Sequence, residues 1–243
     1  MARISHAQFR NVSIVTLLVG VARATYHVHL YHICNASPYF KRAFKGSRDQ
    51  AANKYSIELV DDDADTVERF VSWLYSKTYT LPPFYTEEET HERFNQLAKL
   101  NVFADKYNIP ALSNDTIDRL WDPWHLYLDN ILSSRKIFCP RISLVAYVYE
   151  HTSPDSEFRK TLVDWYTWEI PLKWYDDSRT RDELGEVSRD FAVDLVMALA
   201  KRLADPERPS PFALPKKECD EDRRGDCEDD EAVDLTSCPE NWE

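Results

Sequence analysis

The sequence predicts an α+β fold: a small sheet clasped by helices, followed by an all-helical extension and a disordered acidic tail. Three observations lead to this prediction. Two short apolar strand patterns lie close together near the N-terminus, at 14–19 and 26–29. Apolar residues at helical spacing then recur as far as about residue 205. The last 38 residues hold five prolines, thirteen acidic and five basic residues, and few large apolar side chains.

Composition excludes several classes of function. The chain has 243 residues, 43% of them hydrophobic, which is enough for a real core. Its net charge of −12 argues against general affinity for nucleic acid or anionic membranes, because an acidic protein does not displace the counterions of a polyanion. Four glycines leave no glycine-rich phosphate loop, dinucleotide fingerprint or G-x-S-x-G elbow, and H-E-x-x-H does not occur. We therefore expect no enzyme activity and no cofactor.

The apolar run at 12–22 has two interpretations. Arginines precede it and a small-x-small pattern follows at 22–24, as in a secretory signal that is cleaved. Its valine and isoleucine content, ended by Gly20, instead predicts a buried strand. Eleven residues are too few to span a bilayer. The elements that follow favour the strand, paired with Tyr26–His29 as a hairpin.

Helices and one further strand follow the hairpin. Ser37 is expected to cap a helix over 38–46 that begins with Pro38. Ser56–Leu59 is a short strand. The next helix lies within 61–77, where aspartates crowd the N-terminus and complement the helix dipole. Its apolar stripe consists of Val67, Phe70, Val71 and Leu74.

An exposed loop is expected over 78–90, because this stretch contains Pro82-Pro83 and three consecutive glutamates. Helices over 92–107 and 110–121 complete the first half. In the second half, apolar stripes at helical spacing lie at 124–131, 145–149, 158–166 and 191–199. Three tryptophans there are either core, which the spacing favours, or a recognition surface: Trp165, Trp168 and Trp174.

Four ordered blocks over 12–121 resemble the BTB/POZ family. They are IVTLLVG, YHVHLYHICNASPYFKRAF, IELVDDDADTVERFVSWLY and LAKLNVFADKYNIPALSNDTIDRL. The family's aromatic-x-V-H, hydrophobe and S-P-x-F pattern falls on Tyr26, Val28, His29, Ile33, Ser37, Pro38 and Phe40. Lys77 departs from the family, in which many members have glycine after L-Y-x. The resemblance predicts a BTB/POZ domain at 12–121.

The remaining chain divides into two further predicted parts. A helical extension is expected at 122–205, where LVAYVYEHTSPDSEFRKTLVDWYTWEI resembles the extension of small BTB proteins of filamentous fungi. The acidic tail, at 206–243, lacks the Cys-aromatic-His ending associated with that group.

The resemblance implies a non-enzymatic protein–protein interaction module, an adaptor or scaffold in the cytoplasm, the nucleus or both. Its partners would be proteins: a second copy in a homodimer, or other chains, among them the cullin scaffold of a ubiquitin ligase. About eleven residues precede the first strand. They are too few for the N-terminal helix and strand that many family dimers exchange, so the resemblance is closer to short-form members that bind other partners.

The resemblance also implies where partners bind. The cullin-facing surface of the family corresponds to the loop 78–90 and the turn 105–110. Tyr85-Thr86-Glu87 fits the hydrophobe-x-acid triplet of some adaptors, and the alternative is a solvated acidic loop. The expected partner-binding residues are Phe84, Tyr85, Glu87, Tyr107 and Asn108.

Metal binding is a further alternative. The five cysteines are odd in number and irregularly spaced, so no disulfide framework is predicted. Three of them form C-x7-C-x10-C in the tail, which is either an incomplete zinc site or a set of solvated thiols. His27 and His29 share one face of the predicted strand, but the family pattern assigns His29 to the strand–helix junction. We expect no metal site.

Overall fold

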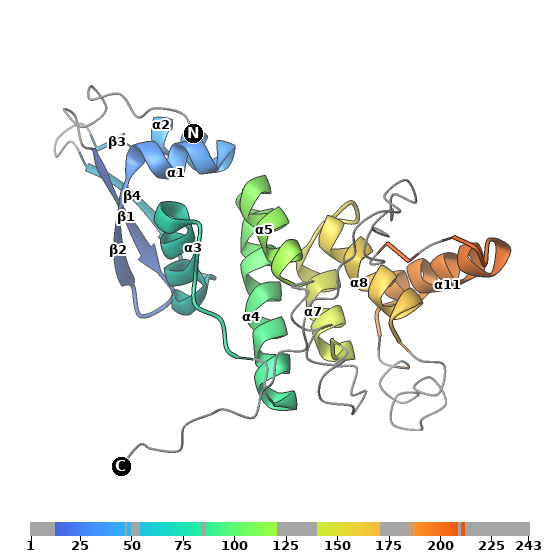
Figure 1. Cartoon of the computed structure of the whole chain (residues 1–243). Helices are drawn as coiled ribbons and strands as arrows, with labels where there is room; N and C mark the ends of the chain where they lie inside the picture. Colours follow the sequence, from blue (N-terminus) through green and yellow to red (C-terminus); the bar gives the residue numbers. More distant parts are fainter. Residues whose placement is uncertain are drawn as a thin grey trace, which may run out of the picture. The chain divides into compact units, whose positions relative to one another are not determined.

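The computed structural model describes residues 13–46, 48–49, 54–83, 86–120, 140–170, 185, 187–208 and 210–211. The chain divides into a unit of residues 1–208, which holds every described helix and strand, and a second unit of residues 209–243. The predicted helix at 124–131 and nearly all of the predicted acidic tail lie outside the described residues. Within the first unit, a mixed sheet with helices is followed by further helices, so the α+β prediction is confirmed (Figure 1).

The sheet has four strands in the order β2-β1-β4-β3. These strands are β1 (Ile14–Val19), β2 (Ala24–His29), β3 (Arg48–Asp49) and β4 (Lys54–Leu59). β1 pairs antiparallel with β2, which confirms the predicted hairpin, and parallel with β4. Cleavage of a signal ending at Ala24 would remove this inner strand, and with it the partner of both β2 and β4. The sheet therefore supports the strand interpretation of the first apolar run.

Buried and more exposed side chains alternate along β1, and the buried ones show which face of the sheet covers the core. Val15, Leu17 and Val19 are fully buried, whereas Ile14 is 42% exposed, as expected for a strand with one covered face. The helix α3 (Ala64–Ser76) lies along the sheet and contributes the buried Val67 and Phe70 to the same core (Figure 1).

Two short helices meet at Ser37. They are α1 (Leu30–Ala36) and α2 (Pro38–Gly46). The Ser37 hydroxyl accepts a hydrogen bond from the Phe40 amide at 3.1 Å, which confirms the predicted cap. The same hydroxyl donates to the Tyr107 carbonyl at 2.5 Å. Ser37 thus starts α2 and fastens it to the end of a distant helix.

The predicted loop over 78–90 is too long. The helix α4 (Glu87–Lys106) begins five residues before the expected start at Glu92. Thr86 and Glu89 form a capping box: the Glu89 amide donates to Thr86 Oγ1 at 3.2 Å, and the Thr86 amide donates to Glu89 Oε2 at 3.0 Å. The glutamates that suggested a solvated loop instead lie in the first helical turn, where they complement the dipole.

Lys77 ends α3 in the left-handed conformation, with φ of 58°. Glycine reaches this conformation at no steric cost, which gives a physical reason for the glycine of many family members. Here the Lys77 ammonium lies 3.7 Å from the centre of the Trp73 ring, a cation–π contact that glycine could not make. Burial lowers the pKa of Lys77, although nearby Asp115 opposes this shift.

Each of the other described helices contacts the described helix that comes before it or after it in the chain. The helices predicted over 92–107 and 110–121 correspond to α4 and α5 (Pro110–Leu120). The helix α4 runs alongside α5, and α3 and α7 are further neighbours (Figure 1). The second half contains α7 (Ile142–His151), α8 (Glu157–Trp168) and α11 (Arg189–Ala204).

The tryptophans of the second half have different surroundings. Trp165 is 7% exposed, as the core interpretation predicts, and its ring centre lies 5.5 Å from that of Phe94 on α4. Trp168 is half-buried, and the Arg202 guanidinium lies 4.6 Å from its ring centre. Trp174 lies outside the described residues.

Gly20 offers a test of the hairpin turn. Its φ is 65°, its amide donates to the Leu59 carbonyl at 2.9 Å, and an added Cβ would meet the Asp62 carbonyl oxygen at 3.4 Å. We expect Gly20→Ala to lower the free energy of unfolding by about 1 kcal/mol, measured by urea denaturation. Gly185→Ala is the control, because no positive φ and no atom within 4 Å opposes its Cβ. Equal effects of the two substitutions would contradict the assigned turn.

Candidate protein-interaction surface

The α3–α4 connection (Lys77–Pro83) has no regular secondary structure, and three helices hold it in place. An arginine from each of α3, α4 and α5 donates to one of its carbonyl oxygens. The bonds run from Arg69 Nε to Thr80 (3.3 Å), from Arg93 Nη1 to Pro82 (3.1 Å) and from Arg119 Nη2 to Lys77 (3.2 Å). Hydrogen bonds to charged donors are stronger than neutral ones. The connection is therefore positioned on the helices although it has no regular structure of its own.

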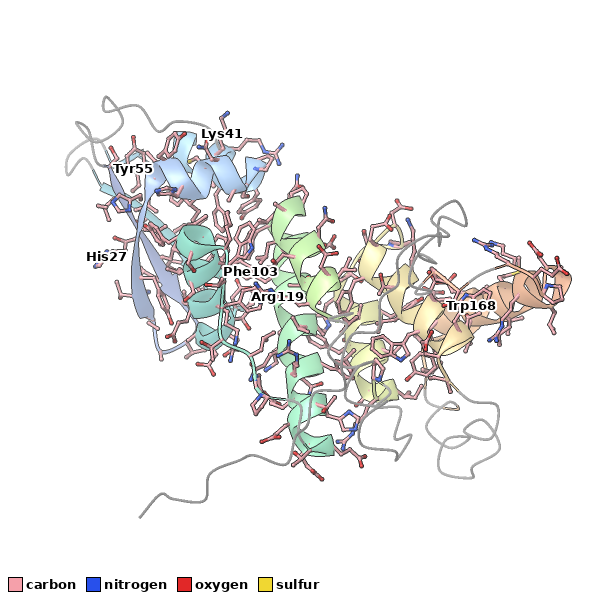
Figure 2. All side chains as sticks on the ribbon, viewed as in Figure 1. His27, Lys41, Tyr55, Phe103, Arg119 and Trp168 are labelled. Atoms are coloured by element: carbon pink, nitrogen blue, oxygen red, sulfur yellow. The ribbon has the colours of Figure 1, made fainter. Side chains whose placement is uncertain are left out.

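Tyr79 anchors the middle of the α3–α4 connection. The side chain is 8% exposed, and the Arg119 guanidinium lies 4.4 Å from the ring centre. Arg119 also pairs with Asp115 one turn earlier, at 2.9 Å. Burial raises the pKa of Tyr79, and the Asp115 carboxylate raises it further. Figure 2 labels Arg119 beside the connection, consistent with its hydrogen bond to the Lys77 carbonyl.

The first turn of α4 presents an acidic surface. Glu87 and Glu88 are exposed, and Glu89 is half-buried. Glu87 Oε1 lies 3.5 Å from Nε2 of His91, one turn along the helix. Burial lowers the pKa of His91, and Arg141 lowers it further, against the opposing effect of Glu87. Burial thus favours the neutral imidazole at position 91, and the Glu87 side chain stays 53% exposed beside it.

The two residues expected in the turn after α4 differ sharply. Tyr107 is 4% exposed, its hydroxyl donates to Asp62 Oδ2, and its ring stacks on Phe40 with centres 5.0 Å apart. Burial and the bond to Asp62 raise the pKa of Tyr107. Asn108 is exposed and has φ of 49°, a conformation that asparagine tolerates better than most residues. Tyr107 therefore supports the turn from inside, while Asn108 faces solvent.

The expected partner-binding residues form two groups rather than one. Glu87 begins α4 and Tyr107 follows its end, so about 30 Å of helix separates them at about 1.5 Å per residue. Phe84 and Tyr85 lie outside the described residues. The sequence does not predict the arginines that hold the α3–α4 connection. Their carbonyl partners lie 11 or 42 residues away in the sequence, and no local pattern indicates such bonds.

The histidines have structural partners. The Tyr75 hydroxyl lies 2.9 Å from the His29 amide nitrogen and 2.7 Å from His29 Nδ1, which ties the end of β2 to α3. His32 lies beside this pair, with its ring centre 5.1 Å from that of Tyr75. His27 instead lies 3.3 Å from Thr16 on the neighbouring strand. His29 thus takes the junction role that the family pattern assigns to it.

Within the part of the chain that the structure describes, no group of three or more His, Cys, Asp or Glu side chains is placed to hold a metal ion. Cys34 is a half-buried free thiol, and burial raises its pKa. The three tail cysteines, Cys219, Cys227 and Cys238, lie outside the described residues. The metal alternative for the tail therefore stays a prediction.

Comparison with known proteins identifies the first half of the chain. A search of curated proteins found no match. Among the helices that the structure describes, none is long and apolar enough to cross a membrane. Residues 6–120 match the sequence model of the BTB/POZ domain, a range that includes every strand of the sheet and the helices α1 to α5. The chain therefore carries a BTB/POZ domain at residues 6–120, and this domain is a non-catalytic protein–protein interaction module.

Proposed function

We propose that this protein is an intracellular adaptor or scaffold, and that its BTB/POZ domain recruits a substrate to a cullin-type ubiquitin ligase. In this proposal the domain over 12–121 recognises the protein partner. The helical extension (122–205) and the acidic tail (206–243) make other contacts. An acidic tail would steer basic partners toward the protein through its electrostatic field.

The arginine-held α3–α4 connection is the observation that carries this proposal. A segment already fixed in its bound conformation loses less entropy on binding than a free loop does. The three arginine–carbonyl bonds and the buried Tyr79 ring supply that fixation. The exposed acidic first turn of α4 begins four residues after Pro83 in the sequence and adds negative charge where a partner would dock.

We assign the contacts of this surface to the residues on either side of the capping box. Phe84 and Tyr85 would supply apolar area, and Glu87 would supply charge. Asn108 would make a second, smaller contact beyond the other end of α4, within the span of a standard-sized interface. Tyr107 would act indirectly, because its ring and hydroxyl hold the turn that presents Asn108.

Charge reversal at Glu87 tests the proposal. We expect the full chain to bind the purified N-terminal region of a cullin, and Glu87→Lys to raise the dissociation constant about tenfold, as measured by isothermal titration calorimetry. Glu150→Lys is the matched control, since Glu150 is an exposed glutamate on α7, and binding should not change. Absence of binding by the wild type, or equal weakening by both variants, would rule out this site.

A further inference from the structure

The helix α11 has apolar side chains on two opposite faces. One face is buried: Phe191 is fully covered and packs edge-on against the rings of Tyr149 and Tyr166, and Leu195 is 7% exposed. The other face is open to solvent. Its large side chains are Val193 (52% exposed), Val196 (63%), Met197 (56%) and Leu203 (81%). Large apolar side chains gathered on one exposed helix face mark an interaction site, so a second occupant is expected on the open face.

The spacing on the open face is that of a helix-pairing seam. Val193, Val196, Ala200 and Leu203 follow one another at intervals of three, four and three residues, the pattern of two heptads. Valine, alanine and leucine side chains at these positions permit close packing of a second helix. A flat or extended partner would not require this periodicity.

The charges beside the seam specify its partner. Asp190 and Lys201 are both exposed and stand eleven residues apart, which is about three helical turns, so they lie on one side of α11 near opposite ends. When two copies of a helix pair antiparallel, each side faces the same side of its partner with the ends reversed. Asp190 of each copy would then approach Lys201 of the other. The two helix dipoles would point in opposite directions, which is favourable.

We propose that the open face of α11 is a self-association surface, on which α11 of a second copy of this chain packs antiparallel. The contact is isologous, so one patch serves both copies. At 16 residues the helix is about 24 Å long, so the interface is small and the dimer should form only as concentration rises. This surface lies outside the BTB/POZ domain and does not depend on the cullin proposal.

Sedimentation velocity of the full chain over a range of concentrations is the first test. The wild type should show a monomer–dimer equilibrium, and Val196→Glu should raise the dimer dissociation constant more than about tenfold, since two charges would enter the apolar seam. Val60→Glu is the matched control, because Val60 is 53% exposed in the turn after β4 and should leave self-association unchanged. Circular dichroism would verify that both variants fold.

Charge reversal distinguishes self-pairing from other occupants. Asp190→Lys and Lys201→Glu should each weaken self-association, because like charges would face each other at both ends. An equimolar mixture of the two variants should restore it. At one end of the mixed dimer, the introduced lysine would face the introduced glutamate. At the other end, the unchanged Lys201 of one copy would face the unchanged Asp190 of the other.

Two outcomes would overturn the self-association proposal or its geometry. A wild type that stays monomeric at the highest soluble concentration would overturn the proposal and assign the face to another segment or another protein. Failure of the mixture to recover would overturn the antiparallel arrangement.

Discussion

Replacing Phe40 by alanine is expected to lower the free energy of unfolding by about 3–5 kcal/mol. The side chain is fully buried, and its ring centre lies 6.1 Å from that of Phe44, 6.2 Å from that of Phe70 and 5.0 Å from that of Tyr107. Phe40 therefore joins α2, α3 and the turn after α4, and the cavity left by truncation could not close without moving all three. Such a loss is a large fraction of the stability of a typical domain.

Urea denaturation followed by far-ultraviolet circular dichroism would measure this loss. Tyr39→Ala is the matched control: Tyr39 is the neighbouring aromatic residue but is 37% exposed, so its truncation should cost about 1 kcal/mol. A cost for Phe40→Ala no larger than that of the control would show that the S-P-x-F segment does not pack as described.

Local patterns were sufficient for most elements of the sheet and helices. Valines and leucines alternate along β1, and a nearby second strand predicts a hairpin; both features depend on residues a few positions apart. The parallel pairing of β1 with β4 could not be predicted in this way, because it joins Val15 to Tyr55 across two helices. The start of α4 has a local signal, Thr86-x-x-Glu89, but the glutamate run beside it also fits a solvated loop, so the sequence alone leaves this boundary open.

The interaction surface was less predictable, for a different reason. Tyr107 and Asn108 are adjacent in the sequence, yet the backbone turn buries the first and exposes the second. The family resemblance places the loop and the turn on one surface, whereas the length of α4 sets the distance between them. Arginine–carbonyl bonds between distant residues order the α3–α4 connection. Every residue has a backbone carbonyl group, so the sequence does not indicate which carbonyl groups accept these bonds.

Arg159→Met should lower the free energy of unfolding by about 3 kcal/mol. The side chain is 6% exposed and lies where α7 turns into α8. Its guanidinium donates from Nε to Thr152 Oγ1 at 3.0 Å, and from Nη2 to the Tyr149 carbonyl at 2.5 Å and to the Thr152 carbonyl. Methionine fills a similar volume but cannot donate, so these buried oxygen atoms would lose their charged partner.

Lys160→Met is the matched control, because Lys160 is the next residue and its side chain is exposed beside Glu157. We expect it to change stability by less than about 0.5 kcal/mol in the same urea titration. The Arg159 variant also probes whether the helical extension folds with the BTB/POZ domain. Trp165 on α8 packs against Phe94 on α4, so loss of the α7–α8 turn should destabilise both halves in one transition. Two separate transitions in the variant, with the first half unaffected, would mean that the extension folds as an independent domain and that the Phe94–Trp165 contact contributes little.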